Sequence, residues 1–420
     1  MRRIVFKRYL SISKEIQECQ QQKKFLKEYK IRTKLEQPII HYSSKQLPKF
    51  SMQKLYKQSE KLSNEFILQN ARDTIEHLLI YNARRLKEFR KLPYLVVLNP
   101  SISESYDIYL QSMSQLLKAS AYIPHNIEEN TKFATEILGE FIDIHADTLP
   151  SLSKGFTEVS NLLSFSQIKK FLDQHLKERI SMRLIAYQHI ELTKSLNNVE
   201  KFVPGGKYNG VIKMLYIPDV IKKNAEIVND ITMMKYDQSV PVQIDTNLLP
   251  VNYWSQVEPE FNKSEEEVLH FPYIEYHLDY ILMELFKNSF RAQIENKVTD
   301  PVVVTISTSL EKSKYLQIRI RDKGKGIPPT TLKNIFDYSF STYESGEGDS
   351  YKTLNVPPGF GGNSVAGIGF GLPLAKQYIE VFNDTIRKED EEEEHVTKGS
   401  LTVQTYNAWG TDIYLKTIGY

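Results

Sequence analysis

Cysteine is nearly absent from this 420-residue chain, since Cys19 is the only one. A single cysteine excludes an intramolecular disulfide, a zinc site built from cysteines and a catalytic thiol outside the N-terminal segment. The chain also lacks any run of about 18 apolar residues, so the sequence predicts no membrane-spanning helix. The net charge is only +2, which gives no reason to expect nucleic acid as a partner.

Glycine is scarce in the first half of the chain, where Gly139 and Gly155 are the only two between residues 51 and 198. Proline is sparse there as well, with breaks near Asn99-Pro100 and Pro124. Long amphipathic runs cover residues 52–93, 105–120, 127–148 and 165–196. Long helices with short connections predict a helical bundle of four helices over residues 51–202.

The N-terminus is basic. Its first 14 residues contain five basic residues, interspersed with apolar ones, and no acidic residue. This pattern predicts a mitochondrial targeting segment over residues 1–25, and the alternative is a disordered basic tail. The polar, Gln- and Lys-rich residues 26–50 predict a linker.

The second half, residues 207–420, has the composition of a mixed domain. A helix is predicted over 220–236, after Pro218. Period-2 alternation or β-branched runs predict strands over 240–244, 302–307, 316–321, 401–406 and 411–416. The predicted fold class is therefore α+β, with a helical bundle followed by a layered sheet domain. An acidic stretch, residues 385–398, predicts a solvated insertion.

The most informative segment is Tyr280–Arg291, which has no glycine or proline and one apolar stripe. Glu284, Lys287, Asn288 and Arg291 stand at positions i, i+3, i+4 and i+7, so they share one face of the predicted helix. The ordinary interpretation is a solvated surface helix with an ion pair. The segments downstream favour a functional interpretation.

Three glycine-containing turns follow. Asp322, Gly324 and Gly326 come directly after a predicted strand, where an aspartate can accept a hydrogen bond from an exocyclic amine. Residues 343–366 have the Gly, Ser and Pro content of a mobile lid, and they lead into Gly367–Gly371 at the start of a helix predicted over 374–382. Backbone N–H groups at such a helix start can receive phosphate. The third turn is Gly410-Thr411.

In this order the motifs resemble those of the ATPase superfamily of gyrase, heat-shock chaperones, histidine kinases and mismatch-repair proteins. The segments Glu284–Asn288, Gly369–Pro373 and Gly410–Leu415 resemble the mitochondrial 2-oxo-acid dehydrogenase kinases more closely. The resemblance extends into the bundle through Phe89–Pro93 and His175–Arg183 and covers roughly residues 65–416. It implies a four-helix bundle followed by an α/β-sandwich ATPase domain.

The resemblance also implies roles for individual residues. Glu284 would be the general base for a substrate serine, Asn288 the Mg²⁺ ligand, and Lys287 would hold either Glu284 or the phosphates. Asp322 would bind the adenine amine beside Gly324, Gly326 and Thr411. Further positions would contact ATP at the lid or along the phosphates: Arg291, Ser341, Thr342, Gly367, Ile368, Gly369, Phe370, Gly371 and Leu372. Backbone carbonyls near Asp337 and Phe340 would hold K⁺.

His145 lies in the bundle and has two interpretations from sequence. It could be a phosphoacceptor, although Ala146 and Asp147 do not match the usual acceptor pattern, or a histidine held at a domain interface. The family resemblance implies that His145 approaches the catalytic glutamate.

The resemblance implies an ATP-dependent serine kinase of the mitochondrial matrix that docks on an E2 lipoyl domain and forms a homodimer. Trp409–Asp412 and His175–Arg179 are similar to the fungal pyruvate dehydrogenase kinases, which favours the E1α serine of the pyruvate dehydrogenase complex as substrate. Many pyruvate dehydrogenase kinases have histidine at the position of Tyr280. In having tyrosine there, this chain resembles the branched-chain kinase instead. A branched-chain E1α kinase is the alternative, and a protein-histidine kinase or an ATP-binding scaffold are remoter ones.

Overall fold

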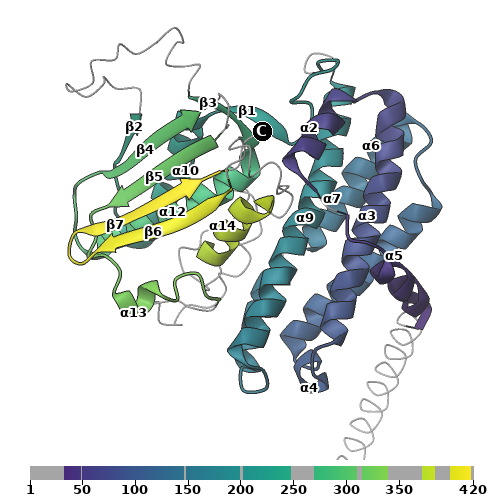
Figure 1. Cartoon of the computed structure of the whole chain (residues 1–420), viewed down its shortest axis with the longest axis horizontal. Coiled ribbons are helices and arrows are strands. Elements are labelled where there is room, and N and C mark those ends of the chain that lie inside the picture. The colour runs from purple at the N-terminus through teal and green to yellow at the C-terminus, as the bar shows by residue number, and fades with distance from the viewer. Residues whose placement is uncertain are drawn as a thin grey trace, which may run out of the picture.

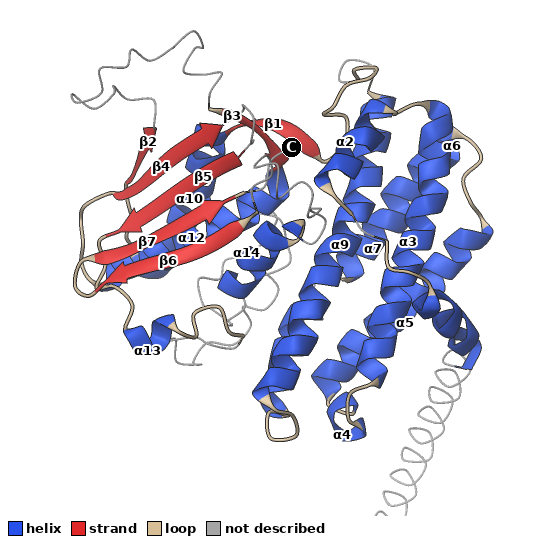
Figure 2. Cartoon of the chain, in the orientation of Figure 1, coloured by secondary structure: helices blue, strands red, loops and turns tan. Residues whose placement is uncertain are grey.

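The computed structural model describes residues 33–48, 50–145, 148–198, 202–246, 269–309, 315–338, 371–383 and 398–417. The predicted targeting segment, the predicted lid and residues 385–397 of the predicted acidic insertion lie outside these ranges. Within them the chain forms a helical bundle followed by a domain that contains all the described strands (Figures 1 and 2). In the described part no helix has the length and apolar content needed to cross a membrane.

The bundle is built on long helices, as predicted. Its helices are α2 (Met52–Glu60), α3 (Asn64–Arg90), α4 (Tyr94–Val97), α5 (Pro100–Ala121), α6 (Ile127–Lys132), α7 (Leu138–Ile144), α8 (Thr148–Glu158) and α9 (Phe165–Asn197). A π-helical turn, η1 (Phe133–Ile137), joins α6 to α7. α3 packs against both α5 and α9, and α7 packs against α9. The four-helix core is therefore α3, α5, the α6–α7 segment and α9.

Local caps explain where these helices begin. The Asn99 side chain accepts hydrogen bonds from the N–H groups of Ser101 and Ile102, and Pro100 occupies the first turn of α5. Ser164 and Gln167 form a reciprocal capping box at the start of α9. Ser63 caps α3, so the run expected over 52–93 is divided into two helices.

The prediction of a linker over residues 26–50 is wrong for residues 33–44, which form a helix. Leu35 and Ile39 of this helix are buried in the core. Ion pairs join Glu36 to Arg90 at 2.9 Å and Lys45 to Glu76 at 2.7 Å. Composition alone did not reveal this helix, because the segment is mostly polar. Two apolar side chains four residues apart are enough to pack one face of the helix against the bundle.

The second domain has a five-stranded sheet with the order β2-β4-β5-β7-β6. The strands are β2 (Val242–Thr246), β4 (Val302–Ser309), β5 (Tyr315–Asp322), β6 (Ser400–Tyr406) and β7 (Gly410–Lys416). β2 and β4 are parallel, and the other pairs are antiparallel. The register aligns Ile306 with Ile318 and Ile318 with Leu415, so buried side chains form rows on one face.

Helices α10 (Ile217–Tyr236), α12 (Glu275–Glu295) and α14 (Gly371–Glu380) cover that face of the sheet (Figure 1). α12 packs on α10, α14 and β5, and α14 also contacts β6 and α9. A short helix, α13 (Pro329–Leu332), follows β5. α14 therefore lies between the sheet domain and the bundle, as Figure 1 shows.

Two strands escaped the sequence prediction. β1 (Ile212–Tyr216) and β3 (His270–Ile274) pair antiparallel in a separate two-stranded sheet. The domain boundary predicted at residues 203–206 falls in the turn between α9 and β1. This turn is pinned to the bundle, because the Asn209 amide donates to the carbonyl oxygens of Ser59 and Val203.

Candidate active site

The polar helix face identified from sequence belongs to α12. Its apolar side chains Leu278, Ile281 and Leu285 are fully buried. The same helix carries Glu284, Asn288 and Arg291 into a cavity of about 340 Å³. The cavity walls come from α12, from the end of β5 and the turn after it, from the start of α14, and from β6 and β7. Their side chains include Ala292, Glu295, Asp322, Lys325, Gly326, Ile327, Pro328, Ile335, Leu372, Pro373, Val403, Thr411 and Ile413.

Glu284 lies at the end of the cavity nearest α14. Glu284 is 7% exposed, and its Oε1 is paired with the Lys287 ammonium one turn later on α12. Lys287 is not among the residues lining the cavity. Of the two roles left open by the sequence, the described structure therefore has Lys287 holding Glu284. A carboxylate fixed at the edge of a cavity suits a proton acceptor.

Gly371 begins α14 directly beside this carboxylate. A Cβ atom built on Gly371 would overlap Oε2 of Glu284. A side chain at Gly371 would therefore require the Glu284 carboxylate or the start of α14 to move. Leu372 and Pro373 continue from this point along the cavity wall.

Asn288 and Arg291 occupy the cavity floor one and two turns beyond Glu284. Asn288 is exposed, and its amide has no hydrogen bond to the described residues. Arg291 is paired with Glu295 at 3.0 Å. A neutral amide oxygen next to a guanidinium can hold a hard cation on one side and anionic oxygens on the other.

Asp322 closes the opposite end of the cavity. It is only 4% exposed, and its Oδ1 accepts a hydrogen bond from the Gly324 N–H at 2.9 Å. The antiparallel register of β5 and β7 places Asp322 opposite Thr411. Burial raises the pKa of Asp322 to about 6, against the opposing effect of the N–H groups of Gly324 and Thr411. A buried acceptor in a mostly apolar pocket can select an amine donor.

Gly326 has φ of +79°, in the region that favours glycine, and a Cβ there would meet the Tyr406 carbonyl oxygen at 2.5 Å. The turn after β5 can therefore lie against the β6–β7 connection. This contact brings Ile327 and Pro328 over the apolar wall formed by Val403 and Ile413.

His145 is in the bundle interior and does not line this cavity. Its Nε2 lies 2.8 Å from the Ser112 hydroxyl, and its backbone oxygen accepts a hydrogen bond of 2.9 Å from Arg179. Burial, together with the Arg179 charge, lowers the pKa of His145 to about 3. A neutral, buried imidazole is a poor candidate for a phosphoacceptor.

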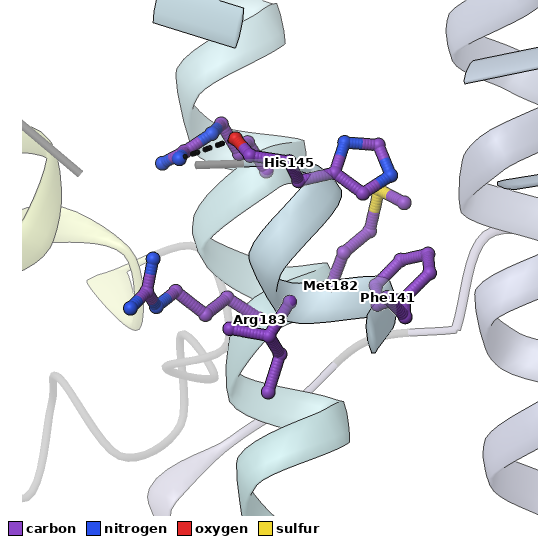
Figure 3. Close-up of a pocket in the computed structure, with 6 residues that line it drawn as sticks. Phe141, His145, Met182 and Arg183 are labelled. Carbon is purple, nitrogen blue, oxygen red and sulfur yellow. Dashed lines mark hydrogen bonds between the residues drawn. The ribbon is translucent and has the colours of Figure 1, made fainter. Parts of the chain in front are cut away.

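A small void of about 10 Å³ adjoins His145 and has room for about one water molecule (Figure 3). In Figure 3 the imidazole and Phe141 lie on one side of α9, whereas the Arg183 side chain extends to the other. Arg179 donates a hydrogen bond to the backbone of His145 in the bundle. Its positive charge also acts on Tyr280 of α12, where it partly offsets the rise in the Tyr280 pKa that burial causes. The approach of His145 to Glu284 stays a prediction.

The structure thus brings together most predicted residues: Glu284, Lys287, Asn288, Arg291, Asp322, Gly324, Gly326, Gly371, Leu372 and Thr411. Ser341, Thr342, Gly367, Ile368, Gly369 and Phe370 lie outside the described residues, as does Phe340. Sequence reasoning missed the apolar wall residues Ile327, Ile335, Val403 and Ile413. For Val403 and Ile413 the strand alternation carried a signal, because inward positions alternate with outward ones.

Family models match two separate parts of the chain. Residues 49–213 match the model described as mitochondrial branched-chain alpha-ketoacid dehydrogenase kinase. Residues 274–407 match the model described as histidine kinase-, DNA gyrase B-, and HSP90-like ATPase. The second range contains the described residues of the cavity except Thr411 and Ile413. The ATPase fold expected for the C-terminal domain is confirmed.

Whole-chain relatives agree with these matches. The chain is 31% identical over 398 residues to mitochondrial [pyruvate dehydrogenase (acetyl-transferring)] kinase 1 of Saccharomyces cerevisiae, which covers 94% of this chain and 90% of the relative. It is 25% identical over 359 residues to the mitochondrial kinase isozyme 4 of Mus musculus, covering 82% of this chain and 75% of the relative.

Proposed function

Because the chain belongs to the family of mitochondrial pyruvate dehydrogenase kinases, we propose that it transfers the γ-phosphoryl group of ATP to a serine of the pyruvate dehydrogenase E1α subunit and thereby inactivates it. The observation that carries the proposal is the single cavity that joins Glu284, Asn288 and Asp322. These three side chains would serve the reacting hydroxyl, the phosphates and the adenine, respectively.

The reaction needs positioning and charge neutralisation more than covalent chemistry by the protein. Asp322 accepts a hydrogen bond from the adenine amine, and the apolar wall with Ile327 and Ile413 excludes water from the base. The serine hydroxyl gives its proton to Glu284 while its oxygen takes the γ-phosphoryl group. ADP leaves with the electron pair of the broken bond. Lys287 keeps the glutamate aimed at the hydroxyl.

Mg²⁺ fits the polar end of the cavity. Asn288 offers an exposed amide oxygen there, and the described residues contain no group of three or more His, Cys, Asp or Glu side chains that could hold a metal. A site with one protein oxygen suits Mg²⁺, which takes its other ligands from water and phosphate. When bound, the ion neutralises phosphate charge.

Several finer assignments belong to the same proposal. The kinase would act in the mitochondrial matrix, dock on an E2 lipoyl domain and work as a homodimer. Backbone carbonyls near Asp337 and Phe340 would hold K⁺. The relatives are named as mitochondrial kinases, which supports this compartment.

The E1α subunit of the branched-chain 2-oxo-acid dehydrogenase is the second candidate substrate. The bundle matches the family model that carries the branched-chain kinase description, and this observation supports it. The 31% identity over 94% of the chain to a kinase named for pyruvate dehydrogenase favours the first candidate.

A side-by-side phosphorylation assay tests the proposal. Purified chain is incubated with radiolabelled ATP and each purified E1α, and acid-stable phosphoserine is measured. We expect transfer to pyruvate dehydrogenase E1α and a loss of about 10²- to 10⁴-fold in Glu284→Gln, the contribution usual for a positioned base. No transfer to either E1α would refute the kinase. Acid-labile phosphate on the chain itself would favour a histidine kinase, and preference for the branched-chain E1α would favour the second substrate.

A further inference from the structure

One carboxylate of the bundle contacts two segments that border the nucleotide cavity. Asp173 lies in the third turn of α9, and its Oδ1 accepts hydrogen bonds from two different parts of the ATPase domain. One donor is the Tyr338 hydroxyl, and the other is the Gln377 amide at 3.4 Å. A second contact lies one turn earlier on α9, where the Lys169 ammonium pairs with Asp337 at 2.5 Å.

The two donors belong to two walls of the cavity. Tyr338 follows three residues after Ile335, which lines the cavity. Gln377 is in α14, whose first residues Gly371 and Leu372 line it as well. Along α14, Gln377 lies about 10 Å from Gly371 at a rise of about 1.5 Å per residue. A displacement at the contact with Asp173 would therefore move residues that line the cavity.

The hydrogen bond between Tyr338 and Asp173 is partly buried rather than exposed on the surface. Tyr338 is only 5% exposed, although it has a hydroxyl that needs a partner. Burial, together with the hydrogen bond to Asp173, raises the pKa of Tyr338, so its hydroxyl remains a donor. Asp173 is half-buried. A hydrogen bond from a buried phenol to a carboxylate is stronger than one between neutral groups.

The consequence extends to the catalytic carboxylate. α14 begins at Gly371, which lies so close to Glu284 that a side chain there would displace the carboxylate or the start of α14. Interiors packed to this density transmit small shifts instead of absorbing them. The position of α14 relative to α9 therefore helps to set where Gly371 meets Glu284.

We propose that Asp173 of the bundle is a positioning residue for the nucleotide site, acting through Tyr338 and Gln377 on two walls of the cavity. Asp173 does not contact the nucleotide in this proposal, which rests on the proposed ATP site. It gives the bundle a direct mechanical influence on nucleotide affinity. A displacement of α9 would move Asp173 and, through its hydrogen bonds, the two cavity walls that carry Tyr338 and Gln377.

The test measures ADP binding by isothermal titration calorimetry on the full chain with Mg²⁺ present. In Asp173→Ala we expect the Kd for ADP to rise about tenfold, which corresponds to the loss of one charge-assisted hydrogen bond. Tyr338→Phe should raise it in the same direction. The combined variant should show less than the sum of the two effects, because both changes remove one shared contact.

Two further variants separate positioning from general destabilisation. Asp173→Asn keeps an acceptor oxygen and should retain most of the affinity. Glu191→Ala removes another carboxylate of α9, which pairs with Lys194 at 2.9 Å and with Lys213 of β1 at 3.8 Å. None of these three residues lines the cavity, so this change should leave the Kd unchanged. Thermal unfolding without nucleotide is recorded for each variant, so that lower affinity can be compared among variants of equal stability.

The outcomes distinguish this inference from the proposed function. If the unsubstituted chain binds no ADP, the proposed ATP site itself is wrong. If it binds ADP while Asp173→Ala and Tyr338→Phe bind with unchanged Kd, only the positioning role is overturned. Additive effects of the two substitutions would also overturn it, since they would act independently.

Discussion

Gly371 and Glu284 are in direct contact: the first residue of α14 presents its bare α-carbon to the carboxylate that the proposed reaction uses as a base, and a Cβ there would overlap Oε2. The contact joins two residues that are 87 positions apart in the chain (371 − 284). Because the contact is this tight, the position of the Glu284 carboxylate depends on where α14 begins.

The first prediction concerns this contact. Gly371→Ala would displace Glu284 or the start of α14, and a shift of about 1 Å at a catalytic group can cost roughly 100-fold in rate. We expect a loss of that order in phosphoryl transfer, measured with E1α at saturating ATP.

Gly139→Ala is the matched control, because a Cβ at Gly139 meets nothing within 4 Å. Gly139 lies within α7, where alanine favours the helix by about 1 kcal/mol, so this control should keep full activity and gain stability. Full activity of Gly371→Ala would show that the carboxylate needs no defined position.

The second prediction uses the raised pKa of Asp322. A carboxylate accepts a hydrogen bond from an amine more strongly than a protonated carboxyl group does. The affinity for ADP should therefore be greatest above pH 6 and should fall as the pH decreases through about 6, the pKa of Asp322. In Asp322→Asn this pH dependence should disappear. Calorimetric titrations from pH about 8 to about 5 measure it.

Without nucleotide, the stability of the folded chain should change with pH in the direction opposite to that of the ADP affinity. The pKa of Asp322 is about 6 in the folded chain against an ordinary value of 3.8, so ionisation costs the folded state roughly 3 kcal/mol. This group therefore favours folding most below about pH 4, and its penalty develops as the pH rises through 6. Asp322→Asn should raise the melting temperature at neutral pH. Parallel pH profiles for binding and stability would contradict the assignment.

The third prediction addresses the bundle interior, where Arg85 is fully buried and pairs with Glu178. Among the described residues, Arg85→Met leaves Gln174 as the remaining donor to the buried Glu178 carboxylate, and breaking a buried pair typically costs about 3–5 kcal/mol. Urea denaturation should report a loss of this size.

Replacing both Arg85 and Glu178 with leucine should recover much of that stability, because no unpaired charge then remains. Lys91→Ala, which removes an exposed ion pair with Glu88, should cost less than about 1 kcal/mol. An equal cost for the single and double replacements at the buried pair would contradict the interpretation.

Sequence patterns predicted the architecture and most of the candidate site, because both depend on local periodicity. The face of Glu284, Asn288 and Arg291 follows from helical spacing alone. The proximity of Asp322 and Thr411 follows from strand register, which a linear sequence only suggests. Segments that dock through few residues, such as 33–44, could not be distinguished from linkers by composition.

Contacts between the domains had no sequence signal. Asp173 is one of many carboxylates in an amphipathic helix, and nothing in its neighbourhood indicates that Tyr338 and Gln377 converge on it. Lys287 was ambiguous for a related reason. An ammonium one turn from a carboxylate can reach either the carboxylate or a ligand, and the structure was needed to show that Lys287 pairs with Glu284.

The last prediction concerns Tyr280, which stands one turn before Glu284. Its side chain is buried, its ring lies 5.1 Å from that of Tyr378, and its hydroxyl has no hydrogen-bond partner in the described part of the chain. Burial and the nearby Glu284 charge raise the pKa of Tyr280, so the hydroxyl stays protonated. A buried hydroxyl without a partner costs about 1–3 kcal/mol, whereas the ring supplies apolar contacts.

Tyr280→Phe should therefore keep phosphoryl transfer and raise the free energy of unfolding by about 1 kcal/mol, because only the unpaired hydroxyl is lost. Tyr280→Ala serves as the contrasting variant, since it also removes the ring and should destabilise the chain by about 3–5 kcal/mol. Transfer rates and urea denaturation are measured for both. Loss of transfer in a stable Tyr280→Phe would show that the hydroxyl acts on Glu284, and the residue would then belong to the reacting groups rather than to the packing beneath them.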